Sequence, residues 1–141
     1  SMGGLIARRY IQLFGEENID KLILIANPNY GIFGNTEKLC GYFGADLECR
    51  DMKNGSLFLD KLNSGKQASI HITNIIGIGC NMDEKTGDGI VLNESAFLTG
   101  NNVENIYING NCSGVKFLHN EILNPEKYSE IIEILKQKIK S

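Results

Sequence analysis

The feature that most constrains the fold is a short apolar run, KLILIA, that closely follows a segment with helical periodicity. The run extends from Leu22 to Ala26 with no polar residue between the apolar ones. A strand with one solvated face alternates apolar and polar residues, so a continuous run indicates a strand covered on both faces, as in a parallel sheet. Helices must then cover both sides of that sheet, which favours an α/β fold.

Two further segments read as strands of the same sheet. Residues 68–79, ASIHITNIIGIG, are rich in β-branched side chains, and residues 103–110, VENIYING, form a similar run. A polar loop is expected between them at residues 80–89, CNMDEKTGDG, followed by a short helix in VLNESAFL. The alternation of helices and strands predicts about three parallel strands with flanking helices.

The helices are predicted from periodicity and capping residues. Residues 2–14 form a helix whose apolar face carries Ile6, Tyr10, Leu13 and Phe14. Ser56 is the expected N-cap of a helix over LFLDKLN that ends near Gly65. Asn124 is expected to cap the last helix, with Pro125 at its first position. Residues 36–50 give a mixed signal, for which we expect short helices broken at Gly41 and Gly44.

Composition excludes several classes of protein. The length of 141 residues suits one domain, and a net charge of -3 without a basic stripe argues against nucleic acid as a partner. No apolar run is long enough to span a bilayer, and no charged and apolar leader typical of a signal peptide is visible, which slightly favours the cytoplasm.

Cysteine spacing gives no metal site. The four cysteines form no CxxC pair, so we expect no metal and no other cofactor. Four cysteines allow three disulfide pairings between which sequence cannot choose, and reduced, mostly buried thiols are favoured. These residues are Cys40, Cys49, Cys80 and Cys112.

Three residues with the chemistry of a serine hydrolase fall at predicted strand ends or helix starts. Ser1 precedes the first helix, Asp88 follows the second strand, and His119 follows the third. A serine hydroxyl needs a base, histidine is suited to that role near neutral pH, and a carboxylate orients the imidazole. The chain order Ser, Asp, His is the order used by α/β-hydrolases.

Several motifs carry a resemblance to that family. SMGG at residues 1–4 matches the nucleophile elbow G-x-S-x-G, often GHSMGG, from its serine onward. ANPNYG follows the next strand as in the family, GDGIVLNESAFL resembles its acid loop, and HNEILNPEKYSEIIEIL resembles its histidine loop and closing helix. The chain therefore resembles the C-terminal half of a lipase-type or esterase-type α/β-hydrolase.

The resemblance implies a function and a set of roles. It implies a serine ester hydrolase in which Ser1 is the nucleophile, Asp88 the acid, His119 the base, and the Met2 backbone N–H an oxyanion donor. The substrate is then a small-molecule or lipid ester. Thioesterase, phospholipase and acyltransferase reactions share this machinery and are not separated by it. A substrate pocket is expected at Asn27, Tyr30 and Phe33, and residues 36–65 are expected to form a lid or acyl-pocket wall.

The same resemblance implies that the chain is partial. The Gly-x before the serine and the strands that lead to the elbow are absent from residues 1–141, so this is expected to be an incomplete domain whose partner is its own N-terminal half. By itself it is expected to be weakly active or inactive. The alternative is a non-catalytic fragment or a degenerate hydrolase-like binding module.

Other interpretations of single residues stay open. Ser-Met also remains after removal of some affinity tags, so the origin of Ser1 is not fixed by the sequence. Asp83 and Glu84 compete with Asp88 as the acid, although the Gly-Asp-Gly-Ile-Val context favours Asp88. His71 lies within a strand pattern and is expected to be structural.

Overall fold

A computed structural model describes residues 1–34 and 46–141 of the chain. The chain begins with α1 (Met2–Phe14), β1 (Lys21–Ile25), α3 (Asp46–Asp51), α4 (Leu57–Ser64) and β2 (His71–Ile78). It continues with β3 (Cys80–Met82), β4 (Lys85–Gly87), α5 (Asn93–Ala96), β5 (Val103–Asn109), α6 (Leu118–Glu121) and α7 (Ser129–Lys140). Cys40 and the expected helix breaks at Gly41 and Gly44 lie outside the described residues.

The centre of the fold is a three-stranded parallel sheet in the order β1-β2-β5. Leu24 of β1 is in register with Asn74 of β2, which is in register with Asn105 of β5. β2 is the middle strand and is buried over most of its length, whereas β1 is mostly half-buried because it lies at the edge of the three strands. The chain is thus a mixed α/β protein with a parallel sheet, as predicted.

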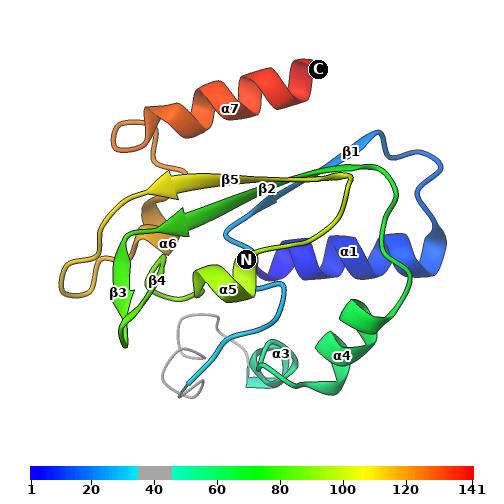
Figure 1. The fold of residues 1–141 in the computed structure, drawn as a ribbon, viewed down its shortest axis with the longest axis horizontal. Coiled ribbons are helices and arrows are strands. Elements are labelled where there is room, and N and C mark those ends of the chain that lie inside the picture. The colour runs from blue at the N-terminus through cyan, green and yellow to red at the C-terminus, as the bar shows by residue number, and fades with distance from the viewer. Residues whose placement is uncertain (35–45) are drawn as a thin grey trace.

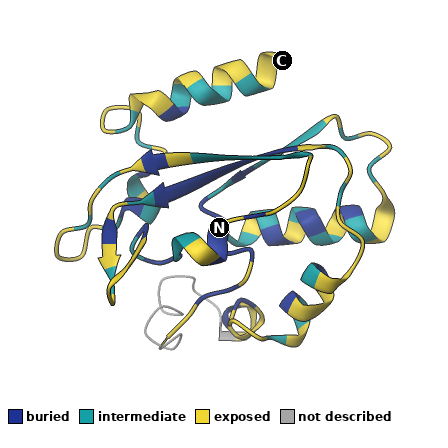
Figure 2. Ribbon diagram, viewed as in Figure 1, coloured by how far each residue is buried: buried dark blue, intermediate teal, exposed yellow. Residues whose placement is uncertain are grey.

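Helices cover both faces of this sheet. α7 lies on one side, and α1 and α4 lie on the other, with the carboxyl ends of the strands pointing toward the β3–β4 hairpin (Figure 1). The core on the α1 side joins α1 and α4 to β2 and to the segment around α5, and its buried residues are Leu5, Ile32, Met52, Leu59, Leu62, Ile76, Ile90, Val91 and Ala96. The core on the α7 side contains Ala26, Ile75, Cys80, Ile108, Leu118, Ile122 and Ile131. Figure 2 shows the buried central strand between these layers. In the described part of the chain, no helix is long and apolar enough to cross a membrane.

The apolar face predicted for α1 does not face the sheet. Its four residues Ile6, Tyr10, Leu13 and Phe14 are exposed, with Phe14 72% exposed, while Leu5 and Ile11 are buried. The helix carries apolar residues on two stripes, and periodicity alone does not say which stripe faces the sheet. Two aromatic side chains of the exposed stripe pack against each other, since the ring centroids of Tyr10 and Phe14 lie 4.9 Å apart.

Helix capping was predicted correctly in one place and wrongly in another. Ser56 caps α4, where its side chain accepts a hydrogen bond from the Leu59 N–H, and the helix ends at Gly65. Asn124 does not cap α7, which begins four residues after Pro125, at Ser129. The Asn124 side chain accepts from the Glu126 N–H and closes a local turn instead, an alternative that Asn offers readily.

The segment predicted as a polar loop after β2 is an antiparallel hairpin of β3 and β4. Its turn is made by Asp83 and Glu84, which have φ angles of 52° and 66°. Two consecutive positive φ values define the type I′ geometry that suits the twist of a two-residue hairpin. The sequence lacks the Asn-Gly or Asp-Gly signal of such turns, so the hairpin was missed.

The expectation of reduced thiols is wrong. Cys80, at the start of β3, forms a disulfide with Cys112 in the loop after β5, across 32 residues of sequence. Cys49 is disulfide-bonded as well, so all three cysteines among the described residues are oxidised. Pairing depends on which loops the fold brings together, and spacing in the sequence does not contain that information.

Candidate active site

Asp88 and His119 form a buried, hydrogen-bonded pair. The Asp88 Oδ2 lies 2.7 Å from His119 Nδ1, and the two side chains are only 1% and 8% exposed. The backbone N–H of His119 also donates to the Asp88 carbonyl oxygen at 2.9 Å. Since Nδ1 faces a carboxylate, it bears the proton, and Nε2 on the opposite side of the ring is the proton acceptor.

The backbone fixes the orientation of the Asp88 carboxylate. Its Oδ1 accepts hydrogen bonds from the N–H groups of Ile90 at 3.0 Å and Val91 at 2.7 Å. Gly77 of β2 lets the acid come close, since a Cβ at this position would lie 2.7 Å from the Asp88 Cβ. One oxygen is therefore held by the loop, and the other is turned toward His119.

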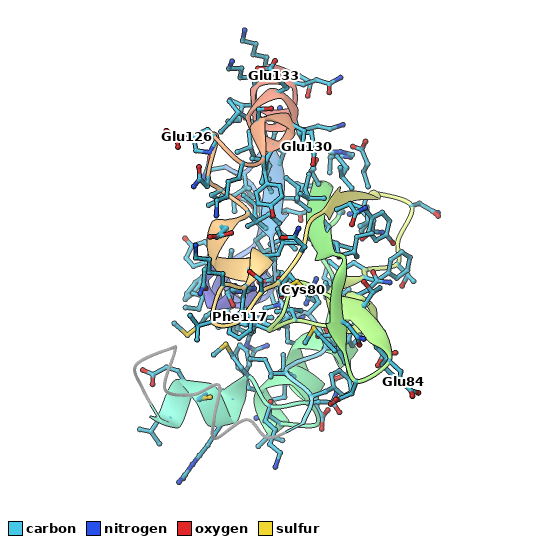
Figure 3. The ribbon with its side chains drawn as sticks, turned by 90° about the vertical axis from the view of Figure 1, so that its left-hand side faces the viewer. Cys80, Glu84, Phe117, Glu126, Glu130 and Glu133 are labelled. Carbon is cyan, nitrogen blue, oxygen red and sulfur yellow. A yellow bond between two sulfur atoms is a disulfide. The ribbon has the colours of Figure 1, made fainter. Side chains whose placement is uncertain are left out.

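The loop that carries His119 is linked covalently to β3 by the Cys80–Cys112 disulfide. The Leu118 N–H donates to the Cys112 sulfur at 3.4 Å, one residue before His119. Figure 3 labels Cys80, which begins β3, and Phe117, which directly precedes α6. Gly89 has a φ of 96°, and a side chain there would meet Cys112 and Phe117, each at 2.7 Å. The acid loop and the histidine loop are thus packed as one unit.

Ser1 lies beside this pair at the start of α1. Ser1 and His119 line the same cavity of about 200 Å³, whose other walls are Ile25, Ala26, Asn120, Ile122 and Leu123. The Ser1 Oγ is buried, makes no capping bond to α1, and has no hydrogen-bond partner in the described part of the chain. Burial lowers the pKa of the Ser1 amino group, and the negative charge of Asp88 opposes this shift. A buried hydroxyl without a partner is unusual enough to need a functional explanation.

The first turn of α1 places backbone amides next to Ser1. Met2 is the first helical residue, so its N–H has no acceptor within the helix and lies at the positive end of the helix dipole. Gly4 allows α1 to start close to the sheet, since a Cβ there would lie 2.3 Å from Asn27 Oδ1 and 2.9 Å from Leu24 Cδ2. Gly3, by contrast, has open space around its Cβ position.

The residues expected in the substrate pocket do not line the cavity of Ser1 and His119. Asn27 is fully buried under α1, and its side-chain N–H donates to Asn29 Oδ1 at 2.6 Å. Tyr30 and Phe33 are 37% and 40% exposed in the segment after β1. None of these three residues lines that cavity, and their role in binding substrate stays a prediction.

The competing acids and the second histidine are remote from this pair. Asp83 and Glu84 are exposed at the turn of the hairpin, and Figure 3 shows Glu84 at its outer tip. His71 is at the opposite end of β2, where its side chain is 53% exposed and lies 3.6 Å from Glu104. Of the three acids considered, Asp88 is the one hydrogen-bonded to His119.

A buried arginine under α1 was not predicted. Arg8 of α1 is 5% exposed, and its guanidinium donates to three amide oxygens, those of Asn29 at 2.9 Å, Asn63 at 2.9 Å and Gln67 at 3.0 Å. Burial lowers the pKa of Arg8 to about 10, so the group is charged at neutral pH. Its helical position between Leu5 and Ile11, on the buried stripe, is the sequence signal that could have revealed it.

Comparisons with known proteins add no family or relative. No family model, no curated protein and no solved structure matches this chain. Within residues 1–34 and 46–141, no group of three or more His, Cys, Asp or Glu side chains is arranged to hold a metal ion.

Proposed function

We propose that this chain carries the nucleophile, acid and base of a serine ester hydrolase of the lipase or carboxylesterase type. The observation that carries the proposal is the buried Asp88–His119 pair beside the unpartnered hydroxyl of Ser1. Three groups with these chemical properties in one buried place are what acyl transfer through a serine requires.

The proposed reaction has two halves. The Ser1 Oγ attacks the ester carbonyl carbon while His119 Nε2 takes the hydroxyl proton, and the Asp88 carboxylate stabilises the imidazolium. The tetrahedral oxyanion is held by the Met2 N–H at the start of α1. His119 then returns the proton to the alcohol oxygen, which leaves, and a water molecule repeats the sequence on the acyl-serine to release the acid.

We also propose that Ser1 is the serine of a nucleophile elbow, as the resemblance implies. The nitrogen of Ser1 donates to the carbonyl oxygen of Ile25 at 3.1 Å, at the end of β1. β1 has a second edge that no strand of the described sheet occupies. A strand leading into Ser1 and parallel to β1 would use this bond as its last rung, which supports the C-terminal half of an α/β-hydrolase as the identity of the chain.

The proposal is tested by covalent labelling of the protein produced from its complete natural reading frame. A fluorophosphonate probe reacts with serines that are activated by a neighbouring base. We expect one labelled peptide, with the phosphonate on Ser1, and loss of labelling in His119→Ala. Labelling of a different serine, or equal labelling of the wild type and His119→Ala, would contradict the proposed roles.

A further inference from the structure

A second cavity lies at the start of α1 and shares no lining residue with the cavity of Ser1 and His119. It has a volume of about 130 Å³ and is lined by Met2, Leu5 and Ile6 of α1, by Met52 and Phe58, and by the carboxylates Glu48 and Asp51. Leu5 and Met52 are buried, whereas Glu48 and Asp51 are exposed. The cavity is therefore apolar inside and acidic at its rim.

This cavity adjoins the proposed reaction centre through Met2. The residue directly follows Ser1, and its side chain lines the apolar cavity. His119 lines the first cavity, together with Ser1. A carbonyl group bound between Ser1 Oγ and the Met2 N–H thus has two directions in which its substituents can extend.

Proton transfer decides which side of Ser1 the alcohol part of the ester occupies and which side the acyl chain occupies. In the proposed hydrolysis, His119 must give its proton to the alcohol oxygen as that oxygen leaves the carbonyl carbon. The alcohol therefore lies on the His119 side of Ser1. The acyl chain, bonded to the same carbon, extends away from His119 toward Met2.

We infer that the cavity of Met2, Leu5, Ile6, Met52 and Phe58 binds the acyl chain, and that the preferred substrates are esters of short, uncharged acyl groups. This inference rests on the proposed function. The volume is well below the roughly 300–1,000 Å³ of pockets for drug-sized ligands, so it suits a chain of a few carbons. The acidic rim at Glu48 and Asp51 repels an acyl chain that ends in a carboxylate.

The test measures kcat/KM of the complete natural protein on p-nitrophenyl acetate, butyrate and octanoate. We expect butyrate to be the best of the three. Ile6→Trp fills the cavity from its solvent side, since Ile6 is 58% exposed, and should lower the butyrate-to-acetate ratio by about tenfold or more. Phe58→Ala enlarges the cavity and should raise the octanoate-to-butyrate ratio. Leu13→Trp is the matched control, because Leu13 is also 58% exposed on α1 but lies outside the cavity.

The outcomes separate this inference from the proposed function. A wild-type protein that hydrolyses octanoate faster than butyrate, or an Ile6→Trp variant whose ratio equals that of Leu13→Trp, overturns the acyl pocket while leaving the hydrolase intact. A wild-type protein that neither hydrolyses any of the three esters nor reacts with the fluorophosphonate overturns the proposed function, and the acyl pocket with it.

Discussion

The carboxylate of Asp88 and the imidazole of His119 are joined by a 2.7 Å hydrogen bond although 31 residues separate them in sequence. The acid lies beyond a hairpin that projects from the end of β2, and the histidine lies beyond the loop after β5. Adjacent parallel strands bring the two loops together at one end of the sheet, which is where α/β proteins place their functional groups.

Asp88→Asn tests the orienting role of the acid. An asparagine keeps the shape of the side chain but removes the carboxylate that holds the proton on His119 Nδ1. In the proposed hydrolase, kcat should fall on the order of 10⁴-fold, with little change in the binding of ester. Asp83→Asn, at the exposed turn of the hairpin, is the control and should keep near-normal kcat. A large loss of kcat in Asp83→Asn would contradict the assignment of Asp88 as the acid of the triad.

The Cys80–Cys112 disulfide should stabilise the fold and the site together. It closes a loop of 32 residues, for which the entropic model gives about 3–4 kcal/mol of unfolding free energy. The variant with Cys80→Ser and Cys112→Ser should lose this amount in urea denaturation. It should also lose ester hydrolysis at urea concentrations below its denaturation midpoint, where it is still folded. The reason is that Cys112 accepts a hydrogen bond from Leu118, next to His119. Full activity of the folded double variant would show that the disulfide does not position His119.

Arg8 should be a strong determinant of stability. Arg8→Met removes the charged donor to three amide oxygens under α1. The Asn29 oxygen is buried and still accepts from Asn27, whereas Asn63 is half-buried and Gln67 is exposed. Hydrogen bonds to a charged group contribute about 1.5–3 kcal/mol, so the variant should lose about this much in a denaturant titration. Arg9→Met is the matched control, because within residues 1–34 and 46–141 Arg9 bonds only the neighbouring Gln12 side chain. It should change stability by less than about 0.5 kcal/mol. Equal effects of the two variants would contradict the interior role of Arg8.

Acid should weaken the contact between β5 and α7. A hydrogen bond from Lys138 lowers the pKa of Glu104, so the folded state favours the ionised carboxylate. The resulting stability is present above the ordinary pKa of glutamate, about 4.3, and is lost as the pH falls through the lowered pKa. The pair is partly exposed, so the effect should be below about 1 kcal/mol. Glu104→Gln should lower stability at pH 7 and leave it unchanged at pH 2, and a variant with wild-type stability at pH 7 would contradict the contribution.

The fold was predictable where local signals and burial agree. The run at Leu22–Ala26 predicted a parallel strand, and Ser56 marked a helix start, because each depends on residues close in sequence. The start of α7 was mispredicted, since an Asn side chain can cap a turn as readily as a helix. The pattern of α1 also left open which of its apolar stripes packs on the sheet.

The candidate site was predictable in part for a different reason. Asp88 and His119 were singled out by the order of motifs, and their contact follows from the parallel sheet. Three other features join segments that are far apart in sequence. They are the disulfide, the hydrogen bonds of Arg8 to side-chain amides, and the apolar cavity at Met52 and Phe58. Such long-range contacts have no local signature, so only the folded structure reveals them.

The most direct measurement of the central claim compares His119→Ala with His71→Ala in the complete natural protein. The claim is that His119 is the base for Ser1, and the rate of p-nitrophenyl butyrate hydrolysis reports it. Removing a member of a catalytic triad lowers the rate by several orders of magnitude, because its members act as a unit. His71 is exposed at the far end of β2, so His71→Ala should hydrolyse the ester at close to the wild-type rate. We predict that His119→Ala is inactive in the same assay, and a His119→Ala variant with near-normal turnover would contradict the account.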